Sequence, residues 1–402
     1  MKWLSCMLLA GGCATATVGD DALVQRARDI HARVITIDTH DDIPFTYATA
    51  QVNACDSTRL QVDLPKMVAG GLDVAFLIVY VGQGPRTPEG NEKAKQDALT
   101  KFNAIQRMTS EMCPQSIALA RTADDVERIA RTGKKVAAIG IENGYVIGRD
   151  LTLVRRYHKL GARYMTLAHA DHNDIADSAT PRESEHGGLS AFGEQVVAEM
   201  NRVGIMVDVS HVSKAAMLHA VRVSRAPVIA SHSSVRAIAN HARNMDDEQL
   251  QALKRNGGVM QTVAYASYVK VQPAERQQAV QALREKLLVR GGQSVRDLPA
   301  DQRAEYEREL AEIDKKWPRA TVQDFVDHID YAVRLIGIEH VGISSDFDGG
   351  GGVEGWNNAA ETFNVTLELV RRGYSEADIA KLWGGNLLRV WRAVEQVART
   401  AS

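Results

Sequence analysis

The sequence lacks an excess of charge of either sign, and it lacks any long apolar run. The formal charge is -2 over 402 residues, which gives no reason to expect a nucleic acid or an anionic membrane as a partner. No run of residues is long and apolar enough to span a bilayer. The composition, 45% hydrophobic and 24% charged, is ordinary for a globular protein and ample for a large core.

The N-terminal segment differs from the rest of the chain. Lys2 precedes a short apolar stretch and a run of small residues that ends at Ala16, a pattern typical of an export signal. The residues before Cys13 also resemble a bacterial lipoprotein box, with the leucine one place further upstream than usual. Soluble export after cleavage at Ala16, a lipid anchor on Cys13 and a simple apolar tail all stay open. We expect residues 1–20 to precede a single domain over 21–402, exported to the periplasm or cell envelope.

Cysteine is scarce, and only two cysteines remain once this segment is set apart. Cys55 and Cys113 lie in neither a CxxC nor a CxxH pattern, so they are poor candidates for metal ligands. In an exported protein they can pair as one disulfide, because the compartment is oxidising. Two free thiols are the alternative that the sequence leaves open.

Strand-like apolar segments alternate with helix-like segments, which predicts parallel strands joined by crossover helices. The segment 74–80 is apolar throughout, as expected for a strand that is covered on both faces. Eight such strands predict an α/β fold, a closed (β/α)8 or TIM barrel, with a doubly wound open sheet as the alternative. The expected strands are 34–37, 74–80, 136–141, 163–167, 205–209, 227–230, 258–263 and 341–345. The expected helices include 91–109, 151–160, 193–203, 214–221 and 322–336.

The stretch 273–320 interrupts this alternation after the seventh strand. It is rich in Glu, Arg, Gln, Lys and Ala, and it predicts a charged helical insertion on the carboxyl side of the barrel. A solvated helical pair and a lid or oligomer contact both stay open as its role. Residues 375–398 are expected to form helices packed on the barrel, with a turn at Gly384-Gly-Asn386.

Histidines and carboxylates directly follow several of the expected strands. They are His40, Asp42, Glu142, His211 and His232. The carboxyl ends of barrel strands converge on one face, so we expect these side chains to meet there. Residues two apart in a strand share a face, so His40 and Asp42 can reach one metal ion. His211 and His232 suit a second, zinc-like ion, and the two oxygens of Glu142 can bridge the pair.

Nine short motifs carry a resemblance to a known family. They are Asp38-Thr-His-Asp-Asp42, Asp63-Leu-Pro-Lys66, Gly140-Ile-Glu-Asn-Gly144, Met165-Thr-Leu-Ala-His169, Val207-Asp-Val-Ser-His211, Ser231-His-Ser-Ser234, Arg243-Asn244, Ser345-Asp-Phe-Asp-Gly349 and Gly384-Gly-Asn386. From about Ile35 to Val390 the chain resembles the renal (membrane) dipeptidase family of zinc dipeptidases. The resemblance implies a barrel of the metal-dependent amidohydrolase type that binds two Zn²⁺, cleaves dipeptides and forms a homodimer. It implies one zinc on His40 and Asp42, the other on His211 and His232, and a bridging Glu142.

The resemblance also implies roles that spacing alone leaves open. His169 matches the histidine that contacts the scissile carbonyl, and Arg243 matches the arginine that holds the substrate's C-terminal carboxylate. Asp346 matches the acid that shuttles the proton. This chain has Ala168 where the family usually has threonine, and Asp171-His172 also departs from many members. These departures bear on substrate preference rather than on the metal site.

The expected reaction is metal-assisted hydrolysis of a dipeptide with a free C-terminal carboxylate, and D-residues at the C-terminal position are among the candidate substrates. Two metal ions would acidify the attacking water. His169 would help to stabilise the oxyanion, and Asp346 would carry the proton to the leaving amine. A metallohydrolase for a non-peptide amide or a β-lactam is one alternative, because Arg243 would also hold the carboxylate of a lactam. A non-catalytic zinc-binding envelope protein is the other, and the intact Asp346 argues against it.

Overall fold

The computed structural model describes residues 14–287, 295 and 298–400, with side chains from residue 21 onward. Eight parallel strands pair with one another in the order in which they occur along the chain. They are β1 (Ile37–Asp42), β2 (Val74–Tyr80), β4 (Lys135–Glu142), β5 (Ala162–Thr166), β6 (Met206–Asp208), β7 (Ile229–Ser233), β8 (Val259–Val263) and β9 (Val341–Ser344).

The two ends of this sheet meet, which closes the barrel. The chain just after β9 returns to β1, where the amide of Asp42 donates a hydrogen bond of 2.8 Å to the carbonyl of Phe347. A doubly wound sheet would reverse its strand order partway across, and this sheet does not. The expected (β/α)8 barrel is therefore confirmed, and the doubly wound alternative is wrong.

Some of the expected strand limits are wrong, and the largest errors involve polar residues. The first strand was expected at 34–37 but is Ile37–Asp42, and the sixth was expected at 227–230 but is Ile229–Ser233. Both contain buried polar side chains that apolar patterning does not register. Thr39, for example, donates a hydrogen bond of 2.7 Å from its hydroxyl to the carbonyl of Ser231. A ninth strand, β3 (Ile117–Leu119), pairs with β4 outside the barrel and was not expected.

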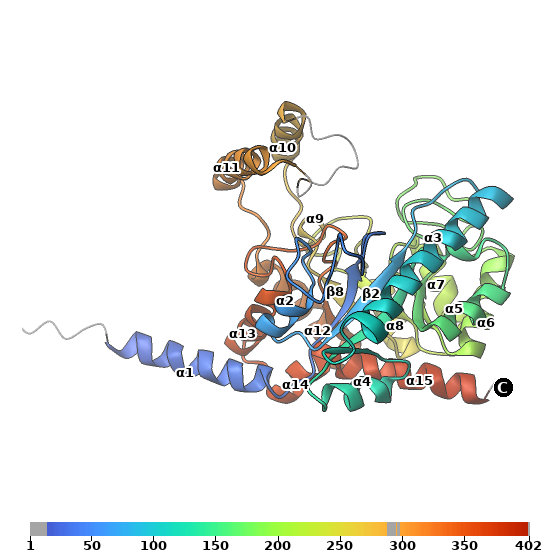
Figure 1. Cartoon of the computed structure of the whole chain (residues 1–402), viewed down its shortest axis with the longest axis horizontal. Helices are drawn as coiled ribbons and strands as arrows, with labels where there is room; N and C mark the ends of the chain where they lie inside the picture. The colour runs from blue at the N-terminus through green and yellow to red at the C-terminus, as the bar shows by residue number, and fades with distance from the viewer. Residues whose placement is uncertain (1–13, 288–294, 296–297, 401–402) are drawn as a thin grey trace, which may run out of the picture.

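The helices lie outside the barrel (Figure 1). Several begin at a residue whose side chain accepts a backbone N–H of the first turn, as Thr87, Ser190 and Asp246 do. The longer helices are α2 (Leu64–Gly70), α3 (Pro88–Arg107), α4 (Ala123–Ala130), α5 (Thr152–Leu160), α6 (Ala191–Val203), α7 (Lys214–Val223), α8 (Asp247–Asn256), α12 (Val322–Ile336) and α13 (Phe363–Arg371). Short turns of helix are η1 (Met108–Met112), η2 (Gly144–Ile147), η4 (Ile338–His340) and η5 (Ala359–Glu361).

The core has two layers, and β2 shows how the sequence divides between them. Val74, Phe76 and Ile78 belong to the barrel interior, whereas the alternate residues of the strand belong to the layer beneath the helices. The C-terminal helix α15 (Asn386–Thr400) covers the amino ends of the strands. Its Trp391 ring lies 5.8 Å from that of Phe76. This end of the barrel is therefore packed for stability.

The turn expected at Gly384-Gly-Asn386 is wrong. A π-helical segment, η6 (Lys381–Gly385), leads directly from α14 (Glu376–Ala380) into α15. Gly384 lies against the first strand, where an added Cβ would approach the side chain of Ile37 to 2.8 Å. The glycines therefore permit close helix–strand packing here and do not break the helix.

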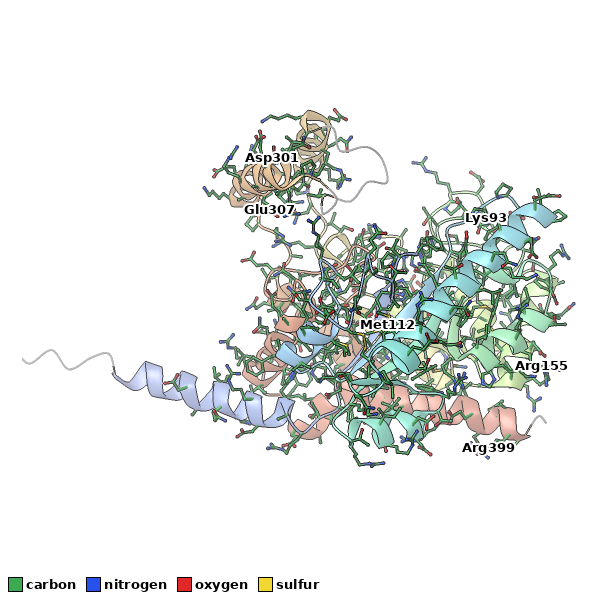
Figure 2. The ribbon with its side chains drawn as sticks, viewed as in Figure 1. Lys93, Met112, Arg155, Asp301, Glu307 and Arg399 are labelled. Atoms are coloured by element: carbon green, nitrogen blue, oxygen red, sulfur yellow. A yellow bond between two sulfur atoms is a disulfide. The ribbon has the colours of Figure 1, made fainter. Side chains whose placement is uncertain are left out.

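The charged insertion forms a helical hairpin that projects from the barrel on the side opposite α15 (Figure 1). After β8 and the short α9 (Ala266–Val269), the chain forms α10 (Ala274–Lys286) and α11 (Ala300–Lys316). Arg276 pairs with Asp314 across the two helices at 2.6 Å. Charged side chains, including those of Asp301 and Glu307, cover the hairpin (Figure 2). The expected insertion is present, and its role stays a prediction.

The described chain begins with α1 (Ala14–His31), which extends away from the barrel in Figure 1. The helix crosses the boundary that we expected near residue 20. Ala27 and Ile30, in its second half, are buried in the core. Cys13 and most of the expected export signal lie outside the described residues. Among the helices that are described, none has the length and apolar character needed to cross a membrane.

Candidate active site

A large cavity opens at the carboxyl ends of the barrel strands, with a volume of about 1520 Å³. It is lined by residues at, or shortly after, the carboxyl ends of all eight barrel strands. Six of the residues singled out in the sequence line it: Asp42, Glu142, His169, His211, Arg243 and Asp346. His40 and His232 are almost fully buried beside them. The structure therefore brings together the whole set of expected ligands and substrate-contacting residues.

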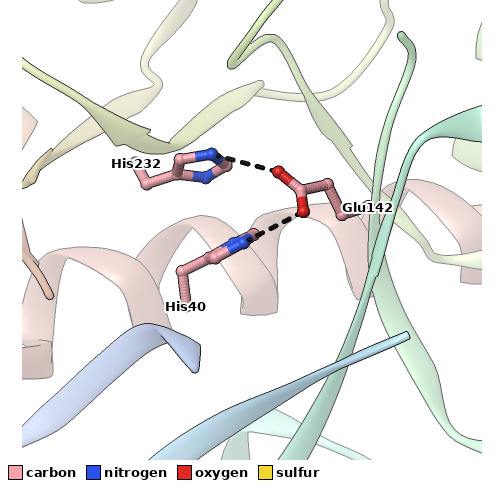
Figure 3. Close-up of side chains that lie close together, drawn as sticks. All are labelled: His40, Glu142 and His232. Atoms are coloured by element: carbon pink, nitrogen blue, oxygen red, sulfur yellow. Dashed lines mark ion pairs between the residues drawn. The ribbon is translucent and has the colours of Figure 1, made fainter. Parts of the chain in front are cut away.

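Glu142, the last residue of β4, lies at the centre of this set (Figure 3). One of its oxygens, Oε2, is 3.5 Å from Nε2 of His40. The other, Oε1, is 3.0 Å from Nε2 of His211 and 3.3 Å from Nε2 of His232. The two oxygens of one carboxylate thus face different histidines, which is the geometry that a bridging ligand between two cations requires.

Asp42 and Asp346 complete the His40 side of the cluster. Nε2 of His40 is 3.7 Å from Oδ2 of Asp42, and one donor atom from each of the three residues lies within 4.8 Å of the others. Both carboxylates crowd Gly349, where an added Cβ would lie 2.2 Å from Oδ1 of Asp346 and 2.3 Å from Oδ2 of Asp42. Glycine at this position therefore lets the chain pass close beside the two carboxylates.

Hydrogen bonds to the ring of His40 determine which of its nitrogens is a free acceptor. The hydroxyl of Tyr164 donates a hydrogen bond of 2.9 Å to the carbonyl of Thr39. Nδ1 of His40, 2.8 Å from the same hydroxyl, must therefore be the donor to that oxygen. Nε2 is then the ring nitrogen that faces Glu142, and it has no hydrogen-bond partner among the described residues. A cation fits this position.

His232 is held in the same way by a chain of two further side chains. The hydroxyl of Ser231 donates to Oδ2 of Asp208 at 2.7 Å, so Nδ1 of His232 donates to the Ser231 oxygen at 2.8 Å. Nε2 of His232 then carries a lone pair, and it lies only 2.7 Å from Nε2 of His211. Two imidazole nitrogens that face one another beside a carboxylate are a donor set that suits zinc.

The pKa shifts at the site follow from burial and from the proximity of opposite charges. Burial would lower the pKa of His40, but Glu142 and Asp42 outweigh it and raise that pKa to about 9. Burial would raise the pKa of Glu142, yet the surrounding histidines hold it well below its usual range. Burial also raises the pKa of the Asp346 carboxyl well above its ordinary value. A cation in place of the protons would satisfy the same carboxylates.

Several strand-end residues have an unfavourable backbone conformation. His211 has a φ of 65° and Asp346 a φ of 60°, both in the left-handed region that non-glycine residues seldom adopt. Asn143, directly after Glu142, has a φ of 76°. Strain of this kind persists where the surrounding structure holds a residue in a required position, and it often marks a functional site.

Arg243 and His169 lie on the walls of the cavity. The Arg243 guanidinium donates from Nη2 to the carbonyl of His232 at 3.0 Å and lies 5.3 Å from the ring centre of Tyr268. Its Nε is buried and has no hydrogen-bond partner among the described residues. His169 lies 3.5 Å from Oε1 of Glu142 through its Nε2. Both side chains are therefore close enough to the cluster to contact a substrate there.

The loop after β1 forms another wall of the cavity, and a disulfide tethers it. Cys55 in this loop is joined to Cys113, which directly follows η1. Asp348 anchors the loop from below, because its carboxylate accepts the backbone N–H groups of Gln61 and Val62. Asp348 thus holds a loop in place, in contrast to the neighbouring Asp346.

Sequence reasoning missed the residues that orient the histidines. Tyr164 and Asp208 are buried on β5 and β6, and no sequence pattern marks Tyr164 as a partner of His40. Asp208 could have been predicted as a supporting residue, because it lies three residues before His211 in the motif Val207-Asp-Val-Ser-His211. His172 and His241 lie outside the groups of described side chains that could hold a metal ion. A (β/α)8 barrel with this donor set at the carboxyl ends of its strands is typical of a metal-dependent hydrolase.

Known proteins resemble this chain over most of its length. The family described as membrane dipeptidase (peptidase family M19) matches residues 24–402. Dipeptidase aclJ of Aspergillus oryzae is 35% identical over 381 residues, which cover 92% of this chain and 80% of that protein. The crystal structure of the probable dipeptidase PvdM from Pseudomonas aeruginosa has a TM-score of 0.82 and 33% identity, and the match covers 94% of this chain and 100% of that one. The chain therefore belongs to the membrane dipeptidase family and is a hydrolase of that class.

Proposed function

We propose that this protein is a binuclear zinc dipeptidase that hydrolyses dipeptides with a free C-terminal carboxylate. The observation that carries the proposal is the position of Glu142. Its two oxygens face His40 on one side and His211 with His232 on the other. Arg243 lines the same cavity and is positioned to bind a substrate carboxylate.

The residues divide into two ligand sets that share Glu142. His40 and Asp42 would hold one zinc ion, and His211 and His232 would hold the other. Two such ions, when bound, lower the pKa of a water molecule toward neutrality, so that a nucleophile forms without a strong base. The buried partners Tyr164 and Ser231 keep the imidazole rings in the tautomer that a metal needs.

Arg243 and His169 would orient the substrate. The planar guanidinium of Arg243 can form two parallel hydrogen bonds to a carboxylate, which lysine cannot do. A dipeptide whose C-terminal carboxylate lies on Arg243 would bring its peptide carbonyl toward His169 and the ligand cluster. His169 would then donate a hydrogen bond to the oxygen on which negative charge develops. A longer C-terminal extension would lose the contact with Arg243.

Asp346 would move the proton. Burial raises the pKa of its carboxyl, which makes the ionised carboxylate a stronger base, so it could take a proton from the attacking water and release it to the leaving amine. Its Oδ1 faces the same space beside Gly349 as Oδ2 of Asp42. The alternative for Asp346 is a purely structural acid that fixes a turn. That role suits Asp348 better, because its carboxylate accepts the backbone N–H groups of Gln61 and Val62.

The cellular location and the oligomeric state are further parts of the proposal. The N-terminal sequence and the disulfide between Cys55 and Cys113 support export to the periplasm or cell envelope. A lipid on Cys13 would tether the protein to the membrane, and Cys13→Ala should then move it from the membrane fraction to the soluble fraction. Wild-type protein already in the soluble fraction would favour cleavage after Ala16. A homodimer is expected from the family resemblance.

A substrate screen with zinc-loaded protein tests the proposed function. It should contain free dipeptides, dipeptides with a D-residue at the C-terminal position, C-terminally amidated dipeptides and β-lactams. We expect hydrolysis of free dipeptides and little of the amides. Turnover of lactams alone would favour the alternative, and a single zinc ion per active chain in elemental analysis would contradict the binuclear site.

Replacement of Arg243 by methionine tests the carboxylate contact. Losing a charge-assisted pair in a desolvated site costs about 2–5 kcal/mol, so kcat/KM for free dipeptides should fall by tens- to thousands-fold. The exposed Arg225 supplies a control, since Arg225→Met removes the same charge outside the cavity. Equal turnover of free and amidated dipeptides by the wild type would show that Arg243 does not bind the carboxylate.

A further inference from the structure

Lys101 is a buried lysine on α3 that lines the candidate active site. The residue is only 4% exposed. Its Nζ lies 5.1 Å from the ring centre of Phe45 and 5.7 Å from that of Tyr80. Across the described chain, no side-chain or backbone oxygen forms a hydrogen bond or ion pair with this ammonium group. An ammonium group on the cavity wall with no anionic partner of its own is available to an anion that enters the cavity.

Carboxylates of the ligand cluster act electrostatically on Lys101. Burial lowers the pKa of Lys101, and the negative charges of Asp42, Glu142 and Asp97 oppose that effect. Asp42 and Glu142 are the groups whose charge the proposed zinc ions would neutralise. Because both carboxylates would then be occupied as ligands, neither would be available as a hydrogen-bonding partner for Lys101, which lines the same cavity.

Lys101 and Arg243 lie on different sides of the ligand cluster. The guanidinium of Arg243 donates a hydrogen bond to the carbonyl of His232, which belongs to β7. Nζ of Lys101 instead lies 5.7 Å from the ring centre of Tyr80, the last residue of β2, and β2 is not a neighbour of β7 in the barrel. A dipeptide whose C-terminal carboxylate lies on Arg243 would span the cluster, and its N-terminal residue would extend toward the Lys101 side.

We propose that Lys101 binds the acidic side chain of aspartate or glutamate at the N-terminal position of the dipeptide. The inference rests on the proposed dipeptidase function and names a substrate class for it. Tyr80 lines the cavity beside Lys101 and supplies an apolar wall of this subsite, where the attraction between an ammonium group and a carboxylate is stronger than in open water. The ring of Tyr80 also lies 4.8 Å from that of His169, so the subsite is continuous with the site of hydrolysis.

The test compares Glu-Ala with Gln-Ala, which differ in charge but hardly in shape. The wild type should hydrolyse Glu-Ala with a kcat/KM about tenfold higher or more, mainly through a lower KM, as expected for a charge-assisted hydrogen bond. Lys101→Met should bring the ratio close to one, and Lys101→Arg should restore part of the preference. Lys93→Met is the matched control, because Lys93 lies on the same helix with a side chain that is 75% exposed (Figure 2). It should leave the ratio unchanged.

Other outcomes would overturn the inference. If the wild type cleaves Gln-Ala and Glu-Ala equally well, the inference fails while the proposed dipeptidase function stands. If Lys101→Met loses zinc in elemental analysis, the lysine balances the charge of the ligands and does not select the substrate. If the variant stops discriminating free from amidated dipeptides, Lys101 holds the C-terminal carboxylate instead.

A binding measurement covers the case in which no dipeptide is cleaved, which would contradict the proposed function. Phosphinate analogues of Glu-Ala and Gln-Ala imitate the tetrahedral intermediate, and calorimetry gives their affinities without turnover. The wild type should bind the glutamate analogue at least about tenfold more tightly, and Lys101→Met should remove the difference. Equal affinities in the wild type would refute the role of Lys101 irrespective of the catalysed reaction.

Discussion

At the scale of single residues, the site depends on side chains whose chemistry is set by their buried neighbours. In His40, Nδ1 is fixed as a donor because the hydroxyl of Tyr164 is already committed as a donor to Thr39, and Nε2 faces the ligand cluster. His232 is held likewise through Ser231 and Asp208. Mutation of such a partner should weaken metal binding although the partner touches no metal itself.

Asp346 provides the sharpest residue-level prediction. Asp346→Asn keeps the shape of the side chain but cannot accept a proton, so kcat for a dipeptide should fall by about 10²–10⁴-fold. Zinc content, measured by elemental analysis, should stay at the wild-type value. A variant that loses zinc would identify Asp346 as mainly a ligand, and one with near-normal kcat would remove it from the proton transfer.

The raised pKa of His40 predicts how metal affinity depends on pH. In the absence of metal, the carboxylates of Glu142 and Asp42 favour the protonated ring, with a pKa of about 9. The ion must displace that proton, so the apparent affinity should rise by about tenfold per pH unit as pH increases toward 9. Competition with a chelator between pH 6 and pH 9 measures this slope. An affinity that is flat over this range would show that the ring is already neutral.

At the scale of elements, the barrel separates stability from function. The amino ends of the strands are filled by apolar side chains beneath α15, whereas the carboxyl ends present buried polar groups to a cavity. The strained backbone at His211 and Asp346 is confined to the second end. Loops at that end are not fixed by apolar packing alone. The disulfide between Cys55 and Cys113 is one of the contacts that constrain them.

Removal of the disulfide tests this role. Cys55→Ser frees the loop after β1 from Cys113 at the end of η1, and the two cysteines are 58 positions apart in the sequence. The free energy of unfolding should fall by about 2–5 kcal/mol, as measured by urea denaturation. Because the loop lines the cavity, KM for dipeptides should rise as well. Cys113→Ser should behave alike, and a reducing agent should have no further effect on either variant.

At the scale of the whole molecule, the hairpin of α10 and α11 is nearly separate from the barrel. Its buried side chains, Leu283, Leu298 and Tyr306, belong to neither of the two core clusters. Its base is narrow, since the side chain of Gln272 donates a hydrogen bond of 3.1 Å to the carbonyl of Pro318. The hairpin is therefore an addition that the barrel does not need in order to close.

A variant with residues 273–317 replaced by a short Gly-Ser linker tests the part this hairpin plays. The midpoint of thermal unfolding should change by only a few degrees, because the hairpin contributes little to the common core. Sedimentation of the full and shortened proteins then reports whether the hairpin forms the contact in the proposed homodimer. Failure of the shortened chain to fold would show that the hairpin and the barrel are one cooperative unit.

The sequence by itself determined the barrel and most of the ligand set. Eight apolar segments separated by helices lead to parallel strands, and their carboxyl ends must share one face of a closed barrel. Residues at or just after the ends of those strands, such as Glu142 and His211, are therefore brought together because each lies at the carboxyl end of its own strand. The limits of β1 and β7 were wrong because buried polar runs follow no apolar pattern.

Only the tertiary structure decided which distant residues support those ligands. Tyr164 lies 124 positions from His40 in the chain, and nothing in its neighbourhood along the sequence indicates the hydrogen bond between them. Nothing in the sequence around Lys101 distinguishes it from the other lysines of its charged helix. Its burial beside the cavity depends on the packing of α3 against the barrel. The physical reason is the same in both cases. Burial and hydrogen bonding between distant segments are set by the closure of the barrel, which local periodicity does not encode.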